Sequence, residues 1–289
     1  MKNSVLGITL LALCSVSFAQ VPALQRATSP ANEQHLASSK QAVLQQHPAP
    51  ASSTDCAFDF TTGSNNTFLH YCVTGNGNVV VLETPQEVPE VSSSKGEGYG
   101  LCDLETGVAY SDFGGFQDVN GSGNWGPATV VSHSATALKI TRTTFDGAFT
   151  LTQNIMRVGG TMPAVKITMT LKNNTGNEKH AFLMRYADVD ADDAQQNNLD
   201  GTFATAMAYN SIAGSLGTVA AFGLMVQNVG NTPFSFDAFA QNTFEPPNPC
   251  QPFAHLTGPT VADGSIVQLY EVDLPKNSSG TASVAYRGM

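Results

Sequence analysis

Three aspartates at alternate positions are the residues in this sequence best suited to hold a metal ion. Asp188, Asp190 and Asp192 lie in the stretch RYADVDADD, and Asp193 adds a fourth carboxylate. Crowded carboxylates repel one another unless a cation or water lies among them, and Ca²⁺ prefers oxygen ligands of this kind. An EF-hand is excluded, because Asp193 replaces the required Gly and Leu199 replaces the closing Glu. The sequence predicts a Ca²⁺-stabilised loop with ligands Asp188, Asp190 and Asp192; the alternative is a solvated acidic loop.

A group of aromatic residues offers a second kind of chemistry. Trp125 is the only tryptophan and lies among glycines, with Tyr99 and Tyr110 nearby in the sequence. An exposed aromatic ring can stack on the apolar face of a sugar, so Trp125, Tyr99 and Tyr110 form a candidate glycan-binding site. The alternative is that Trp125 anchors one end of the core, as buried tryptophans commonly do.

Motifs for catalysis are missing from the sequence. It contains no G-x-S-x-G, H-E-x-x-H, G-x-x-x-x-G-K-[ST] or C-x-x-C pattern. A carboxylate pair for glycoside cleavage would need Asp188 or Asp190 with Glu83, Glu105 or Asp112, and the spacing selects none of these pairs. The sequence therefore favours a non-enzymatic binding or surface protein, with glycan as the first ligand class. The alternatives are a carbohydrate-active enzyme of mutarotase-like or glycosidase type and a purely structural envelope protein.

The segments that carry these residues have the sequence patterns of β-strands. Residues 137–145 and 148–157 flank Asp146-Gly147, a strong hairpin signal that pairs Leu138 with Ile155 and Ile140 with Gln153. Residues 165–171 alternate apolar and polar side chains, and the turn residues 173–176 follow. We expect 165–171 and 179–189 to pair as a second hairpin that presents the aspartates at a sheet edge.

Further strands are expected near 203–209, 218–227, 265–273 and 282–286, with no alternation of strands and helices. Consecutive antiparallel strands of this kind are typical of a sandwich. The predicted fold class is all-β, a large antiparallel β-sandwich, and a supersandwich arrangement would fit the length.

The N-terminus and the cysteines indicate an exported protein. Residues 1–19 resemble a signal peptide, residues 20–55 a disordered linker, and residues 56–289 a single β-sandwich domain. Four cysteines remain after signal cleavage, which suggests two disulfides rather than four free thiols. Alternation in the two flanking segments favours Cys56–Cys72, which leaves Cys102–Cys250.

Charge and hydropathy limit the classes of binding partner. The net charge of −10, with few and scattered Lys and Arg, argues against nucleic acid and anionic membranes. No segment after the signal is apolar enough to predict a membrane span. We expect a secreted, periplasmic or cell-surface location.

Several segments together resemble a set of exported bacterial all-β proteins without established activity. They are EGYGLCD (97–103), GNWGPATV (123–130), ITRTTFDGAFTLTQ (140–153), and KITMTLKN followed by RYADVDAD. At the level of the fold, the chain is also similar to large β-sandwiches of the galactose-mutarotase kind. That similarity implies a carbohydrate context, although no catalytic His and Glu positions can be matched residue by residue.

Overall fold

The computed structural model describes residues 56–91, 96–114, 123–161, 163–213, 219–251, 256 and 259–289. The predicted signal peptide and linker lie outside these residues. Within them, every regular element is a β-strand apart from two single-turn 3₁₀ helices, η1 (Asn65–Thr67) and η2 (Ala191–Asp193). No helix in this part of the chain is long and apolar enough to cross a membrane. The all-β prediction is confirmed.

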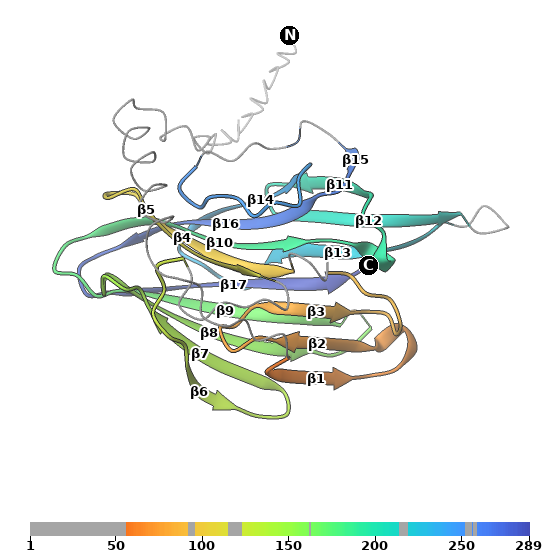
Figure 1. Ribbon diagram of the computed structural model, residues 1–289, viewed down its shortest axis with the longest axis horizontal. Coiled ribbons are helices and arrows are strands. Elements are labelled where there is room, and N and C mark those ends of the chain that lie inside the picture. Colours follow the sequence, from red (N-terminus) through yellow and green to blue (C-terminus); the bar gives the residue numbers. More distant parts are fainter. Residues whose placement is uncertain are drawn as a thin grey trace, which may run out of the picture.

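The strands form three antiparallel sheets, which Figure 1 shows with most strands along the long axis of the molecule. The smallest contains β1 (Phe58–Thr62), β2 (Leu69–Val73) and β3 (Val79–Glu83). The five-stranded sheet has the order β14 (Ser235–Gln241), β16 (Ser265–Leu274), β10 (Lys179–Asp188), β4 (Glu97–Asp103) and β5 (Val108–Gly114). The nine-stranded sheet has the order β15 (Thr260–Ala262), β11 (Asn197–Thr202), β12 (Thr205–Ala213), β13 (Val219–Asn228), β17 (Ser279–Gly288), β9 (Ala164–Asn173), β8 (Phe149–Val158), β7 (Ala137–Thr143) and β6 (Thr129–His133).

One apolar core joins the inner faces of all three sheets. Leu151 and Ile167 of the nine-stranded sheet, Leu183 of the five-stranded sheet and Tyr71 of the small sheet belong to it and are essentially inaccessible to solvent. β8 and β9 alternate buried and more exposed residues over much of their length, the period expected when one face is buried. The arrangement is a β-sandwich, as the sequence predicts.

The small sheet packs against the β6–β8 end of the nine-stranded sheet (Figure 1). The Phe58 ring contacts the His133 ring edge-on at 5.0 Å, and Arg157 Nη1 donates to the Thr61 carbonyl at 3.1 Å. The β2–β3 turn carries Gly77, whose Cα lies close to the Gln153 side chain of β8. The small sheet therefore covers part of the inner face that the five-stranded sheet leaves open.

The hairpin predicted at Asp146-Gly147 is confirmed, register included. Leu138 lies opposite Ile155 and Ile140 opposite Gln153 in the β7–β8 pair. The Gly147 amide donates to the Thr144 carbonyl at 2.8 Å, which closes a turn over residues 144–147, and Gly147 supplies a φ of +75° without strain. Local turn chemistry and the core pattern agree in this segment.

The second predicted hairpin is wrong. β9 and β10 form as strands but do not pair, because β9 lies between β8 and β17 and β10 lies between β4 and β16. The chain crosses from one sheet to the other at residues 174–178, where Asn173 Nδ2 donates to the carbonyls of Asn177 and Leu274. Two strands that face each other across a sandwich bury alternate residues just as a hairpin does, so alternation cannot distinguish the two arrangements.

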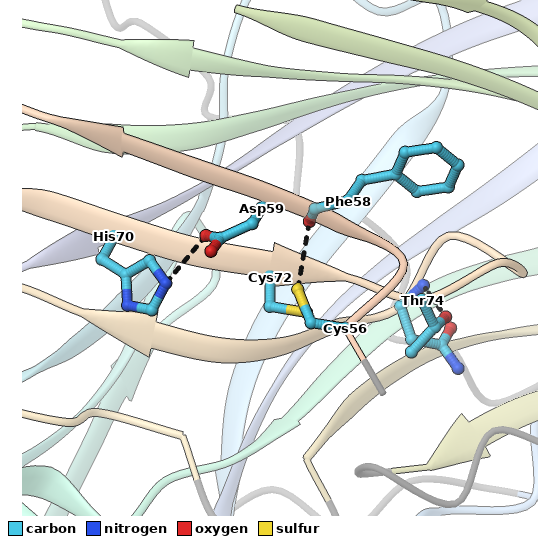
Figure 2. The surroundings of a disulfide bond; sticks show 7 residues. Cys56, Phe58, Asp59, His70, Cys72 and Thr74 are labelled. Carbon is cyan, nitrogen blue, oxygen red and sulfur yellow. Dashed lines mark hydrogen bonds and ion pairs between the residues drawn. A yellow bond between two sulfur atoms is a disulfide. The ribbon is translucent and has the colours of Figure 1, made fainter. Parts of the chain in front are cut away.

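Both predicted disulfides are formed. Cys56–Cys72 joins the entrance of β1 to β2, with Cα atoms 5.5 Å apart, and Cys56 Sγ also lies 3.4 Å from the Phe58 carbonyl (Figure 2). Cys102–Cys250 ties β4 to a loop 148 residues further along the chain, with Cα atoms 5.0 Å apart. Paired cysteines are compatible with the expected export.

Candidate functional site

The aromatic residues predicted to bind glycan lie in the core. Trp125 and Tyr99 are fully buried and Tyr110 is 1% exposed. Trp125 contacts the Tyr99 ring at 5.6 Å and the Tyr110 ring at 5.9 Å. The expectation of an exposed stacking surface at Trp125, Tyr99 and Tyr110 is therefore wrong, and Trp125 is a core anchor. A backbone hydrogen bond from Gly126 to the Thr143 carbonyl, at 2.8 Å, fixes its loop against β7.

Beside these rings lies a buried ion pair that was not predicted from the sequence. Arg142 of β7 contacts the Asp112 carboxylate of β5, and both side chains are 1% exposed. Arg142 also donates to the Tyr99 hydroxyl at 2.7 Å and to the Gly126 carbonyl at 2.9 Å. The pair links the nine-stranded sheet to the five-stranded sheet through the interior.

A second buried ion pair lies nearby. Arg185 of β10 donates to both oxygens of Glu97 on β4 at 2.5 Å, and it also contacts Gln153 of β8. Burial lowers the pKa of Arg185, but the opposing effect of Glu97 and Tyr286 leaves this pKa above its ordinary value. Arg185 is therefore charged, and Glu97 is its counter-ion.

The β2–β3 turn closes this polar interior. Asn76 and Asn78 donate side-chain amides to Asp112, at 3.0 and 2.8 Å, while Arg185 donates to the Gly77 carbonyl at 3.3 Å. The Asn76 carbonyl accepts a hydrogen bond from the Tyr99 hydroxyl at 2.9 Å. The ion pairs thus hold three sheets together and are sealed from solvent. Their signal in the sequence is an arginine at an inward position of an alternating strand.

The aspartates predicted to bind metal are partly brought together. One carboxylate oxygen each of Asp188, Asp190 and Asp263 lies within 4.8 Å of the others, and Asp188 is 2% exposed. Asp263 comes from the β15–β16 turn and was not predicted, because it lies far away in the sequence. Asp192 is not part of this group: its amide donates to the Pro89 carbonyl at 2.8 Å, toward the β3–β4 connection.

The buried Tyr186 hydroxyl lies in the field of several carboxylates near this group. Burial raises its pKa well above the ordinary value, and the carboxylates of Asp188, Glu245, Asp263 and Asp190 raise it further. These four negative charges therefore act on one hydroxyl, which donates to the Phe244 carbonyl. A cation in this region would relieve their mutual repulsion.

A pocket of about 450 Å³ opens at the other end of β16. Phe234, which is 9% exposed, and Pro275 supply apolar walls. The carboxylates of Glu271 and Asp273 lie on the same face of β16, because the two residues are two positions apart in one strand. The hydroxyls of Ser235, Ser278 and Ser279 complete the polar lining.

A histidine stands beside this pocket. His180 Nδ1 lies 2.5 Å from Asp273 Oδ1, and its Nε2 lies 3.8 Å from Glu105. A hydrogen bond to Asp273 is the main cause that raises the pKa of His180, and the nearby carboxylates add to it. The pocket therefore combines a small apolar surface with convergent polar groups, which is the usual composition of a ligand site.

Comparisons with known proteins identify the fold and no family. No protein-family model and no curated protein matches this chain. A bacterial glucoamylase in complex with acarbose aligns with 83% of this chain at 12% identity and a TM-score of 0.51, and the alignment spans 34% of the glucoamylase chain. A putative aldose 1-epimerase from Escherichia coli K12 aligns with 80% of this chain at 10% identity and a TM-score of 0.44, over 99% of its own length. The glucoamylase match shows a shared fold, and this chain spans about a third of that protein.

Proposed function

We propose that the protein is an exported, non-enzymatic carbohydrate-binding protein that holds its ligand in the pocket of Phe234, Glu271 and Asp273. The observation that carries the proposal is the lining of this pocket. A sugar presents an apolar C–H face and a rim of hydroxyls, and the pocket pairs an aromatic and proline wall with carboxylates and serine hydroxyls. The shared fold with part of a glucoamylase supports carbohydrate as the ligand class.

The charge of the pocket selects among sugars. Glu271 and Asp273 accept hydrogen bonds, and charge-assisted hydrogen bonds of this kind are about twice as strong as neutral ones. Two carboxylates also repel an acidic sugar. We therefore expect neutral sugars or amino sugars to bind here and uronic acids to be excluded.

Glycan-array screening followed by titration calorimetry tests the proposal. Glu271→Gln with Asp273→Asn keeps the shape of the pocket and removes both charges, and we expect at least a tenfold loss of affinity. Glu87→Gln, at an exposed position in the β3–β4 connection, is the matched control. Unchanged affinity in the double variant would place the ligand elsewhere.

A carbohydrate-active enzyme is the second candidate. The Cα atoms of Glu271 and Asp273 are about 7 Å apart on one face of β16, a spacing from which two carboxyls can reach the separation of about 6.5–9.5 Å found in inverting glycosidases. Release of nitrophenol from a panel of aryl glycosides tests this candidate directly. Turnover that disappears in Glu271→Gln would replace the binding proposal with a catalytic one.

The acidic group supports a proposal of its own, that Ca²⁺ binds at Asp188, Asp190 and Asp263 and stabilises the domain. Three carboxylate oxygens within 4.8 Å of one another provide hard oxygen ligands at a spacing that one cation can bridge. The test compares melting temperatures in millimolar Ca²⁺ and in chelator, for the wild type and for Asp190→Asn. The wild type should melt higher in Ca²⁺ and the variant should lose this difference; identical wild-type curves would refute the site.

A further inference from the structure

One outer face of the nine-stranded sheet has an unusual composition. We call it the threonine face: the outward side chains of residues 139–143, 150–154, 166–172 and 279–283, on β7, β8, β9 and β17. Every outward position in these ranges is Thr, Ser, Asn or Lys, with no carboxylate and no apolar side chain. The inward positions of β7 to β9 are buried, so this composition belongs to one face only.

Strand register aligns these side chains into rows. Thr141, Thr152, Thr170 and Thr281 are opposite one another across β7, β8, β9 and β17. Adjacent strands are about 4.8 Å apart, so the row presents hydroxyls at a regular spacing. A second row places Lys139, Asn154, Thr168 and Ser283 across β7, β8, β9 and β17.

The hydroxyls are held in place and keep capacity for a ligand. The hydroxyls of Thr141 and Thr152 form a hydrogen bond with Oγ1 atoms 3.1 Å apart, and those of Thr170 and Thr281 form one at 3.0 Å. A hydroxyl has one donor and two acceptor positions. Thr141 also donates to the Leu151 carbonyl at 3.3 Å, so its pair offers acceptors only, while the Thr170–Thr281 pair leaves one donor and several acceptors for groups outside the protein. Because the side chains are β-branched and already paired, little conformational entropy would be lost when a ligand binds.

The charge of the face is opposite to that of the protein. The chain carries a net charge of −10, yet the charged side chains of the threonine face are three lysines, Lys139, Lys166 and Lys172. None of the three forms an ion pair with another described residue. A polyanion would therefore meet attraction here and repulsion over most of the remaining surface.

We propose that the threonine face docks an anionic polysaccharide. Its carboxylates or sulfates would pair with the lysines, and its sugar hydroxyls would bond the rows of threonines between them. The proposal goes beyond the pocket: it uses a different surface and a ligand of the opposite charge, and it does not depend on whether the pocket binds sugar.

The spacing of the lysines argues against other polyanions. Lys166 and Lys172 are six residues apart on β9, about 20 Å, and Lys139 lies two strands away, about 10 Å across the sheet. Duplex DNA carries about one charge per 1.7 Å, so three separated lysines would neutralise little of it. Membrane-binding segments cluster about 4–8 basic residues, and protein interfaces centre on aromatic anchors, which this face lacks.

Affinity electrophoresis through gels that contain alginate, a polyuronate, tests the proposal; gels with dextran provide the neutral comparison. All gels contain chelator, so that calcium bridging plays no part. The wild type should be retarded by alginate and not by dextran, and the retardation should weaken as salt is added. The Lys139→Gln, Lys166→Gln, Lys172→Gln variant should lose about tenfold or more in affinity.

Two further variants identify the cause of any lost binding. The first tests whether the loss comes from missing charge or from misfolding, and the second tests whether the hydroxyls contribute in addition to the charge. Arginine at the same three positions keeps the charge and should keep binding within about twofold. Thr152→Val with Thr170→Val keeps the branched shape, removes two hydroxyls, and should weaken binding while the salt dependence stays the same. The proposal is overturned if alginate does not retard the wild type, if the glutamine variant binds as the wild type does, or if duplex DNA or anionic vesicles bind equally tightly.

Discussion

A buried glutamate should make the protein less stable as the pH rises. Glu90 lies in the β3–β4 connection with no solvent-accessible surface, and its amide donates to the Leu82 carbonyl at 2.9 Å. Burial raises the pKa of Glu90 from 4.5 to about 9; the Gly223 backbone opposes this shift and the Asp192 carboxylate adds to it. In the folded protein the side chain is therefore neutral at pH 7.

The magnitude follows from proton linkage. Below pH 4.5 the carboxyl is protonated in both the folded and the unfolded chain, so the raised pKa costs nothing. Between pH 4.5 and about 9 only the folded state holds the proton, so stability falls as the pH rises. At pH 7 the Glu90 carboxyl of the unfolded chain, with a pKa of 4.5, has lost its proton, and folding must restore it. This costs about 3 kcal/mol, at about 1.36 kcal/mol for each pH unit above the unfolded pKa.

Glu90→Gln removes this titration. Glutamine is neutral at every pH, so the free energy of unfolding of the variant, relative to the wild type, should rise by about 3 kcal/mol between pH 4.5 and pH 7. Any cost of burying an amide is independent of pH and cancels in this comparison. Denaturant unfolding at several pH values, with the disulfides intact, measures the difference. Glu178→Gln controls for loss of an exposed carboxyl, and parallel curves for Glu90→Gln and the wild type would refute the reasoning.

Three further predictions follow from the fold. Replacing both cysteines of Cys102–Cys250 should cost about 2 kcal/mol more than replacing both of Cys56–Cys72, because the loops span 148 and 16 residues; equal losses in denaturant unfolding would contradict this. Arg185→Leu should cost about 3–5 kcal/mol because Glu97 is left buried without its cationic partner, and Glu97→Leu in the same chain should restore much of that loss; a double variant as unstable as the single one would count against the buried pair. Trp125→Ala should cost about 3–5 kcal/mol while glycan affinity at the pocket stays unchanged in calorimetry, and a stable variant that loses its ligand would reverse the assignment of this ring to the core.

Local patterns predicted the parts of this fold that local interactions determine. Asp146-Gly147 fixes a turn, and the turn with its flanking alternation fixes the register of β7 and β8. Alternation around Cys56 and Cys72 selected the correct disulfide, and the other followed by exclusion. The register that this alternation implied is wrong, because Cys72 lies opposite Asp59 in the β1–β2 pair. In each case the partners are close in sequence or few in number.

Arrangements between distant segments could not be predicted in the same way. Residues 165–171 and 179–189 have the alternation of a hairpin, yet they belong to opposite sheets. Trp125 among glycines fits an exposed loop as well as a loop that glycines allow to approach the core closely. Asp263 joins Asp188 and Asp190 only through the β15–β16 turn, which no spacing in the sequence indicates.

The buried arginines had a signal that was open to sequence reasoning. Arg142 follows Leu138 and Ile140 at an inward position of its strand, and Arg185 does the same after Leu183. A charge at such a position needs a buried partner. Which carboxylates supply it, Asp112 and Glu97, depends on how the sheets pack and so on the complete fold.

A sugar should bind in the pocket formed by Phe234, Glu271 and Asp273. The most direct test is calorimetric titration of the best glycan-array ligand into the wild type and into the Glu271→Gln, Asp273→Asn variant. We expect that ligand to be a neutral or amino sugar, and we expect at least a tenfold weaker affinity in a variant that melts as the wild type does. Equal affinities in the two proteins would contradict this expectation.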